Sequence, residues 1–382
     1  MRVSESTVVR HLRDVDDLTP GELETVLNRS ASLKAAHSRG EPHPELDGQT
    51  LAMLFEKPST RTRVSFETGM TQLGGHAIFL GPEDTQLGRG EPIKDTSRAL
   101  SGYVDAVMAR LFDHGELEAL AEHASVPVVN GLTDDAHPCQ TLADLLTIRE
   151  AVGAFEEITA AWVGDGNNVG RSFAVGCAMA GIDLRVATPE GYGLGSDVIE
   201  RAGEYGEGPE LVDDPAEAVE GADIVYTDVW VSMGQEDERE EKLAAFEGYQ
   251  LNEDLLANAP EASVMHCLPA HRGEEITDQV IEGDRALVWQ QAENRLHAQK
   301  GLLAFLVGGD ARQTTLVRIS NPVLEWQCQS TLAFPGEAVT GARARGTRVR
   351  GMSTDVRDRQ GAPSARNRLG RRVAVAGRVG VR

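Results

Sequence analysis

Hydrophobic residues alternate along this chain between short continuous runs and longer stretches with helical spacing. The short runs, typical of buried strands, cover residues 50–55, 76–80, 106–109, 127–130, 158–163, 183–187, 224–227 and 263–268. The helical stretches cover residues 20–39, 60–74, 93–102, 116–123, 140–152 and 290 to about 306. This alternation predicts an α/β protein with two domains, each a parallel β-sheet flanked by helices.

The pattern divides near residue 139, and the length agrees with two domains. A chain of 382 residues with 41% hydrophobic content can bury two modest cores. We expect a first domain at residues 1–138 and a second at 139–288, with the helix 140–152 crossing between them. Residues 289–307 are expected to form a C-terminal helix after the second domain.

Charge separates residues 308–382 from the rest. This segment holds fourteen arginines, no lysine and five acidic residues, a formal charge of +9, which leaves −32 for residues 1–307 out of the chain's −23. The acidic body argues against a general nucleic-acid or membrane-surface binder. The basic segment lacks a helical or strand period and indicates disorder or a non-native extension, such as translation in a shifted frame. A nucleic-acid-binding arm is the alternative.

The acidic body contains only five lysines, which favours adaptation to high salt. The four cysteines, Cys139, Cys177, Cys267 and Cys328, show no CxxC pairing, so a reducing, cytoplasmic location is expected. The first residues lack the pattern of a signal peptide, and no apolar run reaches membrane-spanning length. We therefore expect no membrane association.

The first candidate site lies at the junction between the strand 50–55 and the helix after it. Its sequence is Phe-Glu-Lys-Pro-Ser-Thr-Arg-Thr-Arg, residues 55–63. The free N–H groups of a helix N-terminus, together with hydroxyls and guanidinium groups, suit a phosphate or carboxylate. An ordinary capped helix with surface arginines is the alternative explanation.

Two later segments favour the anion site. His137-Pro-Cys-Gln140 offers an imidazole to polarise a carbonyl and a carboxamide to hold an NH2 group. The sequence His-Cys-Leu-Pro at residues 266–269 ends a strand, where ligands commonly bind in open α/β sheets. Together these groups suggest a small acyl phosphate as substrate.

The glycine-rich sequence at residues 163–170 supports a competing hypothesis. A strand, a glycine-rich turn and a helix also occur in dinucleotide-binding oxidoreductases. That function expects an acidic residue at the end of the next strand, where this chain has Thr188 and Pro189. The dinucleotide hypothesis is therefore the weaker one.

The order and spacing of STRTR, HPCQ and HCLP, about 75 and then 130 residues apart, resemble the aspartate/ornithine carbamoyltransferases. The segment Asp-Val-Trp-Val-Ser-Met-Gly, residues 228–234, is similar to the acceptor loop of ornithine carbamoyltransferases in particular. The resemblance runs from about residue 7 to about 307. It implies the two-domain carbamoyltransferase fold linked by interdomain helices, with the C-terminal helix returning to the first domain.

The resemblance also implies a site for each substrate. The residues implied for carbamoyl phosphate are Ser59, Thr60, Arg61, Thr62, Gln86, Arg110, His137, Gln140, Cys267, Leu268 and Arg295. Of these, Arg110, His137, Cys267 and Arg295 are implied as catalytic. The residues implied for L-ornithine are Asn168, Asp228, Ser232 and Met233. The subunit that supplies Gln86 is left open.

The implied reaction is transfer of the carbamoyl group to the side-chain amine of L-ornithine, giving L-citrulline and phosphate in arginine metabolism. It needs no cofactor and no metal. The implied assembly is a homotrimer or a multiple of it. Cys267 is expected to position the substrate, with a small buried hydrophobe as the alternative role. Putrescine or aspartate is the alternative acceptor.

Overall fold

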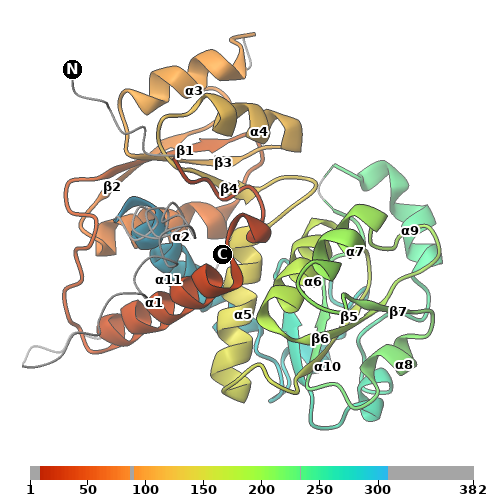
Figure 1. Cartoon of the computed structure of the whole chain (residues 1–382). Coiled ribbons are helices and arrows are strands. Elements are labelled where there is room, and N and C mark those ends of the chain that lie inside the picture. Colours follow the sequence, from red (N-terminus) through yellow and green to blue (C-terminus); the bar gives the residue numbers. More distant parts are fainter. Residues whose placement is uncertain (1–8, 87–89, 233, 309–382) are drawn as a thin grey trace, which may run out of the picture. The chain divides into compact units, whose positions relative to one another are not determined.

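The computed structural model describes residues 9–86, 90–232 and 234–308 (Figure 1). Every described residue belongs to one compact unit. The 308–382 extension and Cys328 therefore fall outside the described residues, apart from Gly308. Among the residues described, no helix combines the length and apolar character needed to cross a membrane.

Two parallel sheets form the framework, as the hydrophobic runs predict. The first has the strand order β2-β1-β3-β4, and the second β7-β6-β5-β8-β9. The strands of the first are β1 (Thr50–Phe55), β2 (His76–Leu80), β3 (Ala106–Arg110) and β4 (Val128–Leu132). The strands of the second are β5 (Thr159–Val163), β6 (Asp183–Ala187), β7 (Glu210–Val212), β8 (Ile224–Thr227) and β9 (Ser263–His266).

Helices connect the strands and cover the sheets. Those of the first half are α1 (Pro20–Ser38), α2 (Thr60–Gln72), α3 (Ile93–Ser101), α4 (His114–His123) and α5 (Pro138–Val152). Those of the second half are α6 (Asn168–Ala180), α7 (Ser196–Gly203), α8 (Pro215–Val219), α9 (Arg239–Ala245), α10 (Asp278–Ile281) and α11 (Val288–Val307). Short 3-10 turns are η1 (Val15–Asp17), η3 (Glu236–Glu238) and η4 (Leu255–Asn258).

Helices α5 and α11 join the two halves. Helix α5 follows β4 and packs on α6 of the second half, and α11 follows the second sheet and packs on α1, α2 and α5 (Figure 1). The return of the C-terminal helix to the first half is thus seen in the structure. Helix α5 lies in the chain between β4, the last strand of the first sheet, and β5, the first strand of the second. The domain boundary at residue 138 remains a prediction.

Two details differ from the sequence-based expectations. The strand expected at 263–268 ends at His266, because Leu268 adopts the left-handed region with φ 60° before Pro269. The three-residue strand β7 was not predicted, since a run of this length carries no period. The acidic segment 236–241 forms η3 and the start of α9. Arg239 in it pairs with Glu274, and the following Lys242 is buried.

Candidate functional site

The N-terminus of α2 lies at the carboxyl edge of the first sheet. Strand β1 ends at Phe55, and its parallel neighbour β3 ends opposite it at Arg110. Ser59 caps α2, since its hydroxyl accepts from the backbone N–H of Thr62 at 3.2 Å. Thr60 and Arg61 occupy the exposed first turn. The predicted anion-binding segment therefore begins at the edge of the sheet where β1 and β3 both end.

Thr62 connects this helix N-terminus to the far end of the sequence. Its hydroxyl oxygen accepts from the Ser59 hydroxyl at 3.0 Å and from Arg295 Nη2 on α11 at 2.8 Å. Because the oxygen accepts twice, the proton of Thr62 is free to point elsewhere. Arg295 thus reaches the segment that was predicted to hold phosphate, and it does not pair with Glu293.

Three cationic or titratable groups are buried close together beside this helix. Arg110, His137 and Arg295 are each less than a tenth exposed. Burial lowers the pKa of Arg110 to about 9, with help from the charges of Arg295 and Arg61. Burial, Arg295 and Arg110 hold the pKa of His137 well below its usual range, so its imidazole is neutral at neutral pH. Burial also lowers the pKa of Arg295.

Several buried polar atoms at this site have no hydrogen-bond partner. They are Nε of Arg110, Nε of Arg295, Nδ1 of His137 and Oε1 of Gln140. Buried polar atoms are normally satisfied, so a group of unsatisfied ones indicates a site for a polar ligand. The local excess of positive charge selects an anion.

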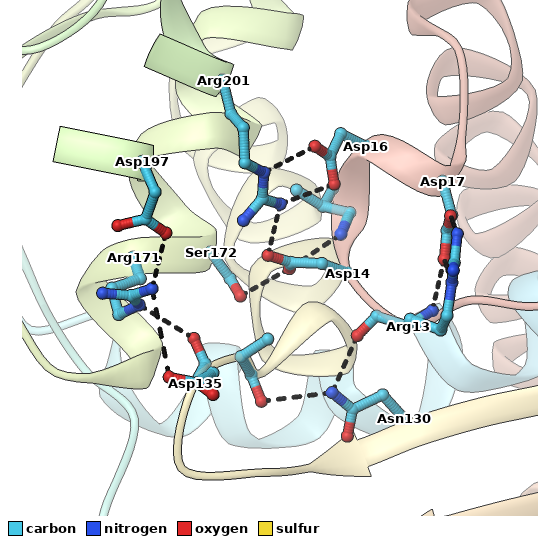
Figure 2. Close-up of polar contacts among 12 residues, drawn as sticks. Arg13, Asp14, Asp16, Asp17, Asn130, Asp135, Arg171, Ser172, Asp197 and Arg201 are labelled. Atoms are coloured by element: carbon cyan, nitrogen blue, oxygen red, sulfur yellow. Dashed lines mark hydrogen bonds and ion pairs between the residues drawn. The ribbon is translucent and has the colours of Figure 1, made fainter. Parts of the chain in front are cut away.

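The backbone of His137 is held by a chain of hydrogen bonds that involves both halves of the molecule. Its backbone N–H donates to Ser172 Oγ at 2.9 Å, and Ser172 donates to Asp14 Oδ1 at 2.7 Å. Arg201 in turn donates to Asp14 Oδ2 at 2.7 Å. Figure 2 shows these side chains converging: Arg201 from α7, Ser172 from α6 and Asp14 from the segment before η1. The imidazole is therefore presented by a fixed backbone.

The predicted acceptor side centres on Asp228 and Cys267, at the ends of β8 and β9. The Cys267 thiol donates to Asp228 Oδ1 at 2.9 Å. Burial and then Asp228 raise the pKa of Cys267 well above its usual value, so the thiol stays protonated. Asn167 Nδ2 donates to the other oxygen of Asp228 at 2.9 Å, whereas the predicted Asn168 donates to the carbonyl of Thr133.

The loop after Asp228 is anchored by a buried lysine. Lys242 Nζ donates to Asp165 Oδ2 at 2.6 Å and to Gln235 Oε1 at 2.9 Å. The same Gln235 oxygen accepts from the backbone N–H of Ser232 at 3.1 Å. Met233, also predicted for this site, lies outside the described residues.

Two further predicted residues, Gln86 and Leu268, have different surroundings. Gln86 is exposed in the segment after β2, where its carbonyl accepts from Glu91 N at 3.1 Å, and this placement does not test its role. Leu268 follows Cys267, and its backbone N–H donates to His266 Nδ1 at 2.9 Å. A positive φ is rare for a bulky side chain and marks a constrained backbone at this point.

Several residues that support the site were not predicted. Asn167 is the N-cap of α6, so a helix starting at Asn168 should have identified it. Asp144 lies one turn after Gln140 on α5 and accepts from its Nε2 at 2.8 Å, a contact that helical spacing predicts. Lys242 and Ser172 give no comparable signal, because the carboxylates that they contact, Asp165 and Asp14, are distant in the sequence.

The described residues include two groups with metal-ligand atoms close together. They are Asp228, His266 and Cys267, and His271, Glu274 and Glu275. In the first group both ring nitrogens of His266 are engaged, Nδ1 by the N–H of Leu268 and Nε2 by Glu275 Oε1 at 3.0 Å. In the second, Glu274 pairs with Arg239. We assign no metal to either group.

The glycine-rich turn has a packing explanation. A Cβ at Gly166 would lie 2.6 Å from the backbone of Gly193, and one at Gly170 would lie 2.8 Å from the Trp162 ring. These glycines permit close approach between elements of the chain itself. The dinucleotide hypothesis therefore loses the observation that supported it.

Parallel sheets whose strand ends converge on a cationic helix N-terminus define an α/β enzyme with a small anionic substrate. The chain belongs to the aspartate/ornithine carbamoyltransferase family. The model of its carbamoyl-P binding domain matches residues 10–150, and that of its Asp/Orn binding domain matches residues 156–306.

Individual relatives agree with the family models. An ornithine carbamoyltransferase from Haloquadratum walsbyi is 66% identical over 294 residues, covering 77% of this chain and 96% of its own length. One from Pyrococcus abyssi is 53% identical over 305 residues, covering 78% and 96%. The solved ornithine carbamoyltransferase of Pyrococcus furiosus has a TM-score of 0.76 and 52% identity, covering 78% of this chain and 97% of its own. The relatives are matched over nearly their whole length, whereas the family match to this chain stops at residue 306.

Proposed function

We propose that this protein transfers the carbamoyl group of carbamoyl phosphate to the side-chain amine of L-ornithine, giving L-citrulline and phosphate. One observation carries the proposal: Arg295 from the C-terminal helix meets Thr62 at the α2 N-terminus, beside the buried Arg110 and His137. The names of the relatives, all ornithine carbamoyltransferases, support the choice of acceptor.

The phosphate of the substrate is assigned to the start of α2. Ser59, Thr60, Arg61 and Thr62 offer helix N–H groups, hydroxyls and one guanidinium, which neutralise the charge of the leaving group. Arg110 contacts both the phosphate and the carbonyl oxygen. Gln86 is retained as a further carbamoyl-phosphate contact, from its own or a neighbouring subunit.

The carbamoyl group is assigned to the interior of the site. Neutral His137 and Arg295 donate to the carbonyl oxygen, where negative charge develops. Gln140 Oε1 and the backbone carbonyl of Leu268 accept from the carbamoyl nitrogen.

Ornithine is assigned to Asp228, Asn168, Ser232 and Met233. The Asp228 carboxylate suits the α-ammonium, while the Asn168 amide and the Met233 N–H suit the α-carboxylate. The Cys267 thiol, held by Asp228, contacts the approaching amine and is not a covalent nucleophile.

In the reaction, the neutral amine of ornithine forms a bond to the carbonyl carbon, and the electron pair of the C=O bond moves to oxygen. Collapse of this tetrahedral oxyanion breaks the C–O bond to phosphate, which leaves with the bonding pair, and the nitrogen loses a proton. The amine has a lysine-like pKa near 10, so the positive charges and the desolvation at the site must favour its neutral form.

We further propose a cellular setting. The body's charge of −32 and the relative from Haloquadratum walsbyi support a halophilic protein. The family resemblance supports a homotrimer or a multiple of it. The cysteine pattern supports the cytoplasm. A role in arginine biosynthesis is supported by the relative from Pyrococcus furiosus that is named anabolic.

A citrulline-forming assay with an amine panel tests the function. Turnover should be highest with ornithine, and a higher kcat/KM with putrescine or aspartate would contradict the proposed acceptor. Arg61→Ala should reduce turnover at least about 100-fold, since it removes a charge from the phosphate site. Arg63→Ala is the matched control, because Arg63 bonds to Glu67 at 2.9 Å and stacks on Phe79. Equal activity of both variants would contradict the site.

A further inference from the structure

A chain of hydrogen bonds behind Gln140 determines which atom of its side chain faces the site. Gln140 is fully buried on α5, with Nε2 bonded to Asp144 Oδ1 and Oε1 without a partner. The oxygen and the NH2 group of a carboxamide have nearly the same shape. The hydrogen bonds of the neighbouring groups therefore determine which of the two faces the site.

The orientation can be traced to a backbone group that only donates. The N–H of His266 lies 3.0 Å from the side chain of Gln291, so the Gln291 atom that faces it is the oxygen, Oε1. The NH2 of Gln291 must then be the group that lies 2.7 Å from Asp144 Oδ1. Asp144 Oδ1 is therefore an acceptor.

The same oxygen, Asp144 Oδ1, fixes Gln140. Because this oxygen accepts, the end of Gln140 that faces it must be the NH2 group. Gln140 Oε1 is therefore turned away from Asp144. The argument holds for either protonation state of Asp144, because a proton on this carboxyl would reside on Oδ2, next to the Tyr226 hydroxyl at 3.1 Å. That hydroxyl can either donate or accept.

We propose that Asp144, itself oriented by Gln291, is a specificity-determining positioning residue that makes the site select an acyl phosphate bearing an N–H group over one bearing a methyl group. This inference rests on the proposed function. An NH2 on the acyl carbon satisfies the buried Gln140 oxygen, whereas the methyl of acetyl phosphate leaves it desolvated and unpaired. A site that hydrogen-bonds a substrate group rejects the analogue that lacks it.

The test compares the Kd of carbamoyl phosphate with that of acetyl phosphate, measured by calorimetry on the full chain without ornithine. The wild type should bind carbamoyl phosphate about 10- to 100-fold more tightly. Equal affinities would overturn the proposal. Failure to bind carbamoyl phosphate at all would instead overturn the proposed function, so the two failures can be told apart.

Three variants locate the selectivity at Asp144. Asp144→Asn should keep the ratio within about threefold, because its amide oxygen still accepts from Gln291 and Gln140 while its NH2 faces Tyr226. Asp144→Ala and the bulkier Asp144→Val free Gln140 to turn, and should reduce the ratio at least about fivefold. The ratio of two Kd values does not depend on the folded fraction. A ratio unchanged in the Ala or Val variant, or lost in the Asn variant, would overturn the proposal.

Discussion

Burial lowers the pKa values of Arg110 and His137 at this site. Arg110 and His137 lie among other cations, so their protonated forms lose solvation and gain repulsion, and both pKa values fall. For His137 the result is a neutral donor, and for Arg110 it is a cation whose charge is lost near pH 9. A bound phosphate dianion would raise both pKa values again. Substrate binding is therefore coupled to the protonation of Arg110 and His137.

This coupling predicts a pH limit for anion binding. A lowered arginine pKa means that the charge is complete well below pH 9 and is lost as the pH rises through about 9. The Kd of inorganic phosphate, measured by calorimetry without ornithine, should be constant near pH 8 and rise severalfold by pH 10. Arg110→Gln should bind weakly at pH 8 and lack this inflection. A flat wild-type profile up to pH 10 would contradict the assignment of Arg110.

The protonated state of Cys267 predicts how substitutions will behave. Serine keeps a donor for Asp228 in place of the thiol, so Cys267→Ser should retain kcat within about tenfold, whereas Cys267→Ala should lose more. Alkylation of the wild type by iodoacetamide should be slow at pH 8, since the thiolate is scarce. Loss of more than about 10⁴-fold in the serine variant would indicate a covalent nucleophile instead.

Local sequence signals predicted most helices and strands of this fold. Helix α2 begins where Ser59 offers a cap, and α1 begins with the capping pair Thr19 and Glu22 before a helical apolar face. Contacts between distant segments could not be predicted in this way. Arg295 and Thr62 are 233 positions apart, and no local pattern indicates that α11 returns to α2. Only the family resemblance brought these two residues into one site.

The return of α11 depends on a glycine at the crossing with α1. A Cβ at Gly301 would lie 2.1 Å from Ser30 Oγ and 2.9 Å from the Val26 carbonyl oxygen, so no larger residue fits without moving a helix. Gly301→Ala should lower the free energy of unfolding by about 2 kcal/mol or more, measured by urea denaturation. Gly203→Ala is the matched control, since a Cβ there meets nothing within 4 Å, and it should be neutral or slightly stabilising. Equal stability of both variants would contradict the packing of α11 on α1.

On the scale of the whole molecule, the chain consists of an enzyme body and an extension outside the family. The family match ends at residue 306, and the relatives are matched over 96% and 97% of their own length while covering 77% and 78% of this chain. A chain truncated after Val307 should therefore keep kcat and both KM values within about twofold in the citrulline assay. A larger loss would show that the basic extension contributes to the enzyme.

The charge of the body predicts how the protein responds to salt. Three of its five lysines, Lys57, Lys242 and Lys300, are buried, so the acidic surface has few lysines to balance it. At low salt the repulsion among surface carboxylates extends over many ångströms and destabilises the compact state, whereas at 1 M salt the screening length falls to about 3 Å. Thermal melting temperature and turnover should both rise from 0.05 M to molar KCl. The chain truncated after Val307 should respond at least as strongly, because its −32 is no longer offset by the extension. Maximal stability at low salt in both chains would contradict halophilic adaptation.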